Sequence, residues 1–202
     1  MTYHVHGVSA SGNCYKVRLA LEQLKLPYVW HEVDMMHGAT RTDAFRKLNP
    51  NGKVPVLCID ETTTLSESDA ILCYLADGTP LMPDDRLQRA QVLQWMFFEQ
   101  YSHEPYVAVA RFIRQFLKQP DDPRLPEKTA GSYRALDVME QHLATRSFLV
   151  GERYTVADIA LFAYTHVADE AGLDLSRYPG IRAWLDRVRS QPGHVAMPGV
   201  HA

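Results

Sequence analysis

The stretch NGKVPVL at residues 51–57, followed by a Glu67-Ser68 helix start, constrains the fold of this chain more than any other feature. Pro55 stands at the entrance of an apolar strand and cannot donate a ladder hydrogen bond, so the backbone groups of Val54 are expected to stay unpaired. An X-Pro bond is also the usual place for a cis peptide. The free N–H groups of a helix start bind a carboxylate well. The two segments therefore predict a site that holds a peptide by its backbone and its acidic end.

Length and composition are those of an ordinary globular protein. The 202 residues suffice for one domain or two small ones, with 46% hydrophobic and 22% charged residues. A net charge of −3 argues against a nucleic-acid surface, which needs a clustered basic face. The first six residues lack the pattern of a signal peptide, and the apolar residues 156–167 are too short a run to span a bilayer. We therefore expect a cytoplasmic protein without a nucleic-acid or membrane partner.

The cysteines and histidines predict neither a disulfide framework nor a metal site. Cys14, Cys58 and Cys73 are an odd number without C-x-x-C spacing, which is typical of a reduced protein. His4 and His6 share one face of an expected strand and could contact a metal, but no third ligand is evident. We therefore expect no metal cofactor, and Cys58 and Cys73 to be small core residues.

Residues 1–78 predict a small α/β domain. Apolar residues recur at helical spacing from Val17 to Leu24, in a helix that Ser11 or Asn13 caps and Pro27 stops. The expected strands are residues 3–7, 28–33, 54–59 and 62–65, and further helices are expected at residues 38–47 and 66–74. The order β-α-β-α-β-β-α describes a mixed sheet with helices packed on it.

Residues 86–202 predict an all-α domain. The segment at residues 79–85 carries two prolines and is typical of a linker. The expected helices are residues 88–98, 107–117, 128–144, 156–171 and 181–189, with no convincing strand between them.

One local motif in this second half is strong. Thr155-Val156-Ala157-Asp158 has the form of a capping box, with Asp158 in place of the usual Glu or Gln. Tyr154 and Ile159 have the spacing of a hydrophobic staple around it. We interpret this motif as a folding device of a buried helix, and not as a catalytic site.

Five motifs in this order make the chain resemble the cytosolic glutathione transferases over nearly its whole length. They are SGNCYKVR at residues 11–18, LNPNGKVP at 48–55, SES at 66–68, TVAD at 155–158 and YPGI at 178–181. The resemblance is to bacterial-type members of the theta-like or zeta-like serine kind. It implies a thioredoxin-like N-terminal domain, a helical bundle that supplies an electrophile pocket, and a homodimer.

The resemblance also implies a set of residues that hold glutathione as co-substrate: Arg41, Lys53, Val54, Pro55, Glu67 and Ser68. The backbone of Val54 would pair with the cysteinyl part of glutathione beside a cis peptide bond. Glu67 and Ser68 would hold the γ-glutamyl end. Lys53 and Arg41 would lie near the glycyl carboxylate, since a cation opposite an anion is the expected arrangement.

The chemistry needs a group that favours the thiolate, because a free thiol has a pKa of roughly 8.5. A donor at the positive start of the first helix can supply it, and the candidates are Ser9, Ser11, Asn13 and Cys14. Ser11 matches the serine of the family pattern S-x-x-C/S-x-x-V, so we predict that Ser11 is catalytic and Asn13 a supporting donor. Two alternatives stay open: Ser11 could merely cap its helix, and Cys14 could form a mixed disulfide with glutathione.

An electrophile pocket is expected in the second half. Residues 95–106 are rich in aromatic side chains and are interrupted by Pro105. The candidate lining residues are Tyr106, Arg111, Phe112 and Tyr164. The competing interpretation places these aromatic residues in the helical core or a dimer interface. Arg111 and Arg114 beside aromatic residues would favour an acidic co-substrate.

The predicted function is a glutathione transferase, in which the glutathione thiolate attacks an electrophilic small molecule, as in detoxification. A zeta-like isomerase acting on maleylacetoacetate-like acids is an alternative, although the adjacent Ser-Ser-Cys run of those members is missing. A glutathione-dependent disulfide reductase or peroxidase is another, and it would need Cys14. A non-catalytic ligand-binding or interaction module is the alternative of another class, and the retained glutathione motifs disfavour it.

Overall fold

The chain falls into two compact units in a computed structural model that describes residues 2–199. The first unit contains residues 2–77 together with Pro192–Gly199, and the second contains Gly78–Gln191. The expected helical domain at 86–202 thus differs at its end, because residues 192–199 pack with the first unit. The Tyr15 hydroxyl donates to the carbonyl of Val195 at 2.7 Å, and Gly193 (φ +74°) lies against the backbone of Gln23.

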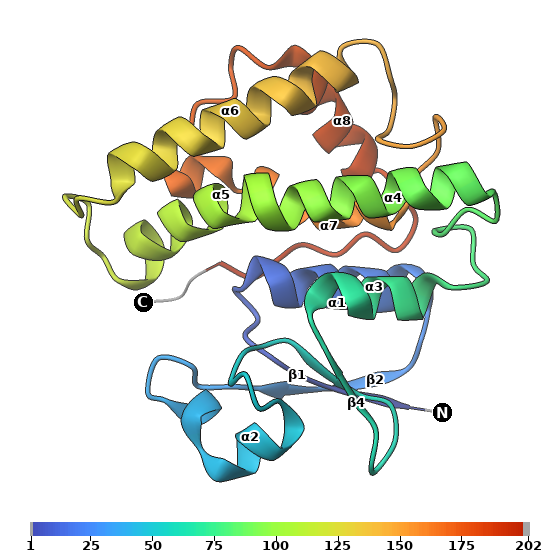
Figure 1. Ribbon diagram of the computed structural model, residues 1–202, viewed down its shortest axis with the longest axis vertical. Coiled ribbons are helices and arrows are strands. Elements are labelled where there is room, and N and C mark those ends of the chain that lie inside the picture. Colours follow the sequence, from blue (N-terminus) through green and yellow to red (C-terminus); the bar gives the residue numbers. More distant parts are fainter. Residues whose placement is uncertain (1, 200–202) are drawn as a thin grey trace. The chain divides into compact units, whose positions relative to one another are not determined.

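The first unit is built on a four-stranded mixed sheet with strand order β2-β1-β3-β4 (Figure 1). β1 (Tyr3–Gly7) is parallel to β2 (Tyr28–Glu32), and it is antiparallel to β3 (Val56–Cys58), which pairs antiparallel with β4 (Thr64–Ser66). β3 begins only after Pro55, since proline cannot join the ladder. The predicted mixed sheet is confirmed.

Helices cover both faces of this sheet (Figure 1). α1 (Gly12–Gln23) and α3 (Ser68–Ala76) pack together on one face, above the fully buried side chains of the central strands. The other face carries α2 (Asp43–Leu48), whose Phe45 packs with Val33 and Val56. The single helix expected at 38–47 is divided into a 3₁₀ turn, η1 (Ala39–Arg41), and α2. Thr42 separates them in an extended conformation, and its hydroxyl caps α2 by accepting from the Phe45 amide.

The second unit is helical, as predicted. Its α-helices are α4 (Arg86–Phe98), α5 (Glu104–Arg111), α6 (Leu125–Leu143), α7 (Val156–Thr165) and α8 (Pro179–Arg189). Two π-helical turns, η2 (Glu99–His103) and η3 (Phe112–Phe116), and a 3₁₀ turn, η4 (Ala168–Ala171), complete them. Every residue of α7 is buried, so this helix lies in the core of the unit.

Two helix predictions for this unit are wrong in detail. Pro105 does not interrupt the helical path, because α4, η2, α5 and η3 run end to end (Figure 1). Pro105 lies in the first turn of α5, directly after a π turn, where its missing amide costs little. The helix expected at 156–171 ends at Thr165. The Thr165 hydroxyl donates to the Leu161 carbonyl, and the ring of His166 contacts the Phe162 carbonyl, so side chains satisfy the last turn.

The predicted capping box at the start of α7 is present. The Thr155 amide donates to Asp158 Oδ2 at 2.9 Å. Asp158 Oδ1 also accepts from the Leu149 amide at 3.0 Å and from Trp184 Nε1 at 2.9 Å. The motif therefore joins the start of α7 to α8 and to the loop before α7.

Candidate functional site

The loop that leads into β3 is held in shape by Asn49. This buried side chain donates to the carbonyl of Lys53 at 2.8 Å and accepts from the amide of Asn51 at 3.0 Å. Gly52 adopts a left-handed conformation (φ +64°), and a Cβ there would come within 3.0 Å of the Thr40 carbonyl. The loop thus lies against η1, and the side chain of Lys53 stays exposed.

Val54 offers an unpaired backbone edge next to this loop. The Val54-Pro55 peptide bond is cis, as the resemblance implies. Within residues 2–199, neither the amide nor the carbonyl of Val54 has a hydrogen-bond partner. An extended peptide ligand can therefore form main-chain hydrogen bonds with this residue, in the manner of an added strand.

The backbone is strained at the residue that precedes α3. Glu67 precedes the helix with φ +67° and ψ 112°, an uncommon conformation for a residue with a side chain. Such outliers gather at ligand sites, where the surrounding structure holds them in place. The Glu67 carboxylate is exposed, whereas Ser68 is buried at the first helical position. The first amides of α3 can bind an anion, and the Ser68 hydroxyl lies at the same helix start.

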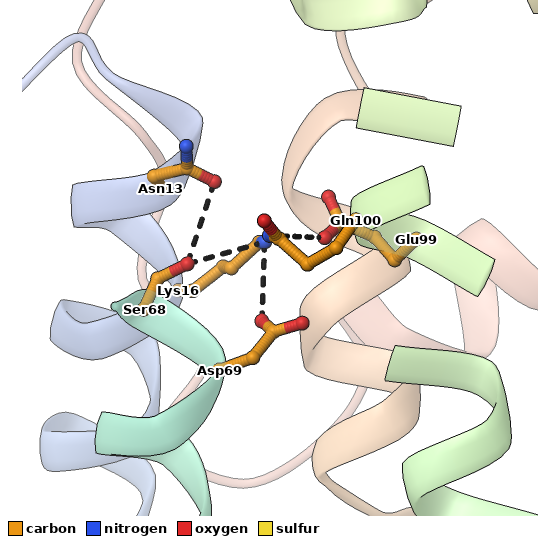
Figure 2. Close-up of polar contacts among 6 residues, drawn as sticks. All are labelled: Asn13, Lys16, Ser68, Asp69, Glu99 and Gln100. Carbon is orange, nitrogen blue, oxygen red and sulfur yellow. Dashed lines mark hydrogen bonds and ion pairs between the residues drawn. The ribbon is translucent and has the colours of Figure 1, made fainter. Parts of the chain in front are cut away.

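A buried lysine stands behind Ser68. Lys16 on α1 is fully buried, and its ammonium donates to Ser68 Oγ at 3.3 Å and to Asp69 Oδ1 at 3.2 Å. The Ser68 hydroxyl in turn donates to Asn13 Oδ1 at 3.5 Å (Figure 2). Lys16 is not among the site residues predicted from the sequence. A signal existed, since Lys16 precedes Ala20 by one helical turn and therefore lies on the apolar side of α1.

Ser11 precedes α1 as its N-cap residue, and its side chain makes no capping hydrogen bond. The alternative that Ser11 merely caps the helix thus lacks its expected contact. Ser9, another candidate, has its amide and hydroxyl directed at the Glu32 carboxylate, at 2.9 and 2.5 Å. Burial raises the pKa of Glu32, but hydrogen bonds from Ser9 and Trp30 outweigh it and lower the pKa overall.

Cys14 points into the protein core. Its side chain is fully buried and its sulfur accepts from the Val8 amide at 3.3 Å. Burial raises the pKa of the Cys14 thiol to about 11, although hydrogen bonds from Val8 and Ser11 oppose this rise. A thiol of this kind is protonated at neutral pH and is a poor nucleophile.

Arg111, a predicted pocket residue, lies in an internal ion pair of the second unit. It is 1% exposed, and its Nε donates to Glu170 Oε2 at 2.7 Å. The guanidinium also lies over the ring of Phe116, at 5.7 Å from the ring centroid. Much of its charge is therefore balanced by Glu170 within the unit.

The other three predicted pocket residues pack within the second unit as well. Tyr106 lies against Gly131 of α6, since a Cβ there would come within 2.0 Å of the tyrosine ring. Phe112 stacks on Phe116 with centroids 5.4 Å apart, and Tyr164 on α7 is 6% exposed. These contacts give each ring a packing role, whatever further role it has.

A cavity of the second unit is lined by Trp95 and Phe98 of the aromatic stretch and by residues in and near α6, but by none of the four predicted pocket residues. Its volume is about 360 Å³, and Trp95 meets Phe98 and His142 there in edge-on contacts. The lining residues are Gln94, Trp95, Phe98, Val138, Gln141, His142 and Arg146.

Residues 2–199 contain no cluster of three or more His, Cys, Asp or Glu side chains arranged to hold a metal ion. His31 joins His4 and His6 on the sheet, but the rings stack, with centroids 5.1 and 4.6 Å apart. In the same part of the chain, none of the helices has the length and apolar character needed to cross a membrane.

Comparison with known proteins identifies relatives that cover most of the chain. The family model for the glutathione S-transferase N-terminal domain matches residues 10–77, and that for the C-terminal domain matches residues 91–192. A solved glutathione S-transferase from Pseudomonas fluorescens Pf-5 is 56% identical, with a TM-score of 0.94 over 96% of this chain and 98% of that one. The disulfide-bond oxidoreductase YfcG of Escherichia coli K12 is 30% identical over 89% of this chain and 87% of its own. Ure2p in complex with glutathione is 28% identical, with a TM-score of 0.86 over 95% of each chain.

Proposed function

The chain belongs to the glutathione S-transferase family, and we propose that it activates the thiol of glutathione for attack on an electrophilic small molecule. Two features of the first unit carry this proposal. The backbone of Val54 has no hydrogen-bond partner among residues 2–199, and the first amides of α3 can bind an anion. A tripeptide with a central amide and a terminal carboxylate fits such a pair.

Each part of glutathione has a counterpart among these residues. The cysteinyl backbone pairs with Val54 beside the cis bond to Pro55. The γ-glutamyl carboxylate binds the Ser68 hydroxyl and the first amides of α3, and the Glu67 carboxylate faces the γ-glutamyl ammonium. The glycyl carboxylate is attracted by two exposed cations, Lys53 and Arg41.

Ser11 is the proposed catalytic residue, with Asn13 in support. Its hydroxyl makes no capping bond and stands at the start of α1, a 12-residue helix with no acidic residue in its first turn. A hydroxyl donor and the positive end of a helix both favour a thiolate over a thiol. Each pKa unit of this preference corresponds to about 1.4 kcal/mol.

The test is a pH titration of the glutathione complex, in which ultraviolet absorbance reports the thiolate and a thermal shift reports binding. We expect Ser11→Ala to raise the apparent thiol pKa by about one unit or more, with glutathione still bound. Ser9→Ala is the matched control, since that hydroxyl contacts Glu32, and it should leave the titration unchanged.

Two results would contradict the proposal. If millimolar glutathione causes no thermal shift, a non-catalytic module on this fold becomes the better interpretation. If Cys14→Ser shifts the thiolate titration and Ser11→Ala does not, Ser11 is not the activating residue.

A second candidate function is glutathione-dependent disulfide reduction, which the similarity to YfcG favours. A route through a mixed disulfide with Cys14 is disfavoured by the burial of that thiol. A route in which bound glutathione itself attacks the disulfide uses the same site as the main proposal. A screen with aryl halides, epoxides, peroxides, disulfides and maleylacetoacetate-like acids separates transferase, peroxidase, reductase and isomerase activities.

The proposal includes a cytoplasmic homodimer whose second unit supplies the electrophile pocket. Free cysteines at positions 14, 58 and 73 fit a reducing compartment. Leu93, Phe97 and Tyr101 are exposed and follow one another every four residues along α4 and η2. An apolar stripe of this kind is typical of a subunit interface.

A further inference from the structure

Lys16 places an ammonium group in the protein interior, where a charge loses its hydration. Its side chain is fully buried, and burying an ammonium costs several kcal/mol unless hydrogen bonds and an opposite charge offset that cost. Asp69 supplies the opposite charge at 3.2 Å, from the first turn of α3. An ion pair that only joined α1 to α3 could be replaced by apolar residues at little cost to stability.

The hydrogen bond from Lys16 to Ser68 has a more specific effect, which is on the direction of the Ser68 hydroxyl proton. An ammonium only donates hydrogen bonds, so Ser68 Oγ must accept from Lys16 at 3.3 Å. The Ser68 proton is thereby directed away from Lys16. It meets Asn13 Oδ1 at 3.5 Å, a long contact and hence a weak hydrogen bond (Figure 2).

We propose that Lys16 is a positioning residue of the glutathione site, which fixes the Ser68 hydroxyl as a donor to the α-carboxylate of the γ-glutamyl group. This inference rests on the proposed function. When that carboxylate arrives, the Ser68 proton moves from its weak contact with Asn13 to a charge-assisted hydrogen bond, which is stronger. Asp69 balances much of the Lys16 charge, so the lysine acts on Ser68 mainly through their direct hydrogen bond.

The experiment measures dissociation constants by calorimetry for three peptides. Glutathione carries both γ-glutamyl charges, glutaryl-Cys-Gly lacks the α-ammonium, and γ-aminobutyryl-Cys-Gly lacks the α-carboxylate. The protein variants are Lys16→Met, the charge-balanced Lys16→Met/Asp69→Asn and the conservative Lys16→Arg. Lys47→Met, an exposed lysine of α2, is the matched control.

We expect the double variant to lose about tenfold or more in affinity for the two peptides with the carboxylate. Its affinity for γ-aminobutyryl-Cys-Gly should change by less than about threefold, because that peptide has no group for Ser68 to bind. Lys16→Arg should retain most of the preference for the carboxylate, and Lys47→Met all of it.

A uniform loss for all three peptides would overturn the proposal, since it would mean that Lys16 only holds α1 against α3. An unchanged affinity for glutathione in the double variant would overturn it as well. Failure of the proposed function is a different result, in which the wild-type protein itself binds no glutathione.

If the two variants that lack the Lys16 ammonium do not fold, a measurement on the wild-type protein tests the proposal instead. With ¹³C,¹⁵N-labelled lysine, the side-chain resonances of Lys16 should shift on binding glutathione or glutaryl-Cys-Gly, and much less on binding γ-aminobutyryl-Cys-Gly. Equal shifts with all three peptides would overturn the proposal.

Discussion

At the scale of single residues, Asp158 shows how one carboxylate holds several elements together. It is fully buried and accepts from the amides of Thr155 and Leu149 and from the indole of Trp184. Burial raises its pKa from 3.8 to about 6, against the effect of these hydrogen bonds. Removing such an acceptor leaves several buried donors unsatisfied.

We predict that Asp158→Asn lowers the free energy of unfolding by about 2 to 4 kcal/mol at neutral pH, because an amide cannot accept from all three donors. Chemical denaturation measures this change. Asp186→Asn is the control, since Asp186 is exposed and pairs with the exposed Arg189, and it should cost less than about 0.5 kcal/mol.

The contribution of Asp158 to stability decreases as the pH rises. The folded protein holds the Asp158 proton more tightly than the unfolded chain does, so this group contributes most stability below pH 3.8 and loses that contribution as the pH rises through about 6. The stability difference between wild type and Asp158→Asn should therefore shrink by roughly 2 to 3 kcal/mol between about pH 4 and 7. A difference that stays constant over this range would contradict the raised pKa.

Residues in contiguous motifs could be predicted from the sequence, whereas residues that depend on a distant partner could not. Val54, Glu67 and Ser68 stand in short segments whose backbone behaviour follows from proline and from a helix start. Lys16 meets its partner Asp69 only across 53 positions, and Arg111 meets Glu170 across 59. A local pattern carries no information on such pairs.

At the scale of elements, α5 and α6 approach each other closely at Gly131. A Cβ at this position would lie within 2.0 Å of the Tyr106 ring. Ordinary helix positions gain up to about 1 kcal/mol when glycine is replaced by alanine. At Gly131 the steric conflict with Tyr106 decides the outcome.

We predict that Gly131→Ala destabilises the protein by about 1 to 3 kcal/mol, despite the better helix propensity of alanine. Thermal or chemical denaturation measures this loss. In a double-mutant cycle with Tyr106→Ala, the second Gly131→Ala step should cost much less than in wild type. If its cost is the same in both backgrounds, close packing against Tyr106 is not the reason for the glycine.

The types of the elements could be predicted from apolar periodicity and from residues that end helices and strands, but the exact ends of the elements could not. The strands, the helices and the capping box follow from apolar spacing and from residues such as Pro27. The π turns η2 and η3 keep the helical spacing of side chains, so no residue type in the sequence distinguishes them from an α-helix. The end of α7 depends on side chains of Thr165 and His166 that bond to its own last carbonyls.

At the scale of the whole molecule, the apolar stripe of α4 and η2 bears on assembly. Phe97 is 68% exposed and Tyr101 is 85% exposed. We predict that Phe97→Glu shifts the proposed dimer toward monomer, because a buried charge in an apolar interface has no partner. Analytical ultracentrifugation over a range of concentrations measures this shift.

The matched control for this test is Val29→Glu, which places the same charge at an exposed apolar position of β2 that does not belong to the stripe. It should leave the sedimentation of the protein unchanged. A wild-type protein that sediments as a monomer at all concentrations would contradict the dimer itself.

The hydrogen bond from Tyr15 to Val195 spans 180 positions of the chain, and this has a consequence for synthesis on the ribosome. The N-terminal residues of the first unit emerge early, and domains tend to fold as they emerge. The segment that lies against α1 appears only after the whole second unit has been translated. The first unit to begin folding is thus the last to be completed, and a chain released before residue 192 lacks part of it.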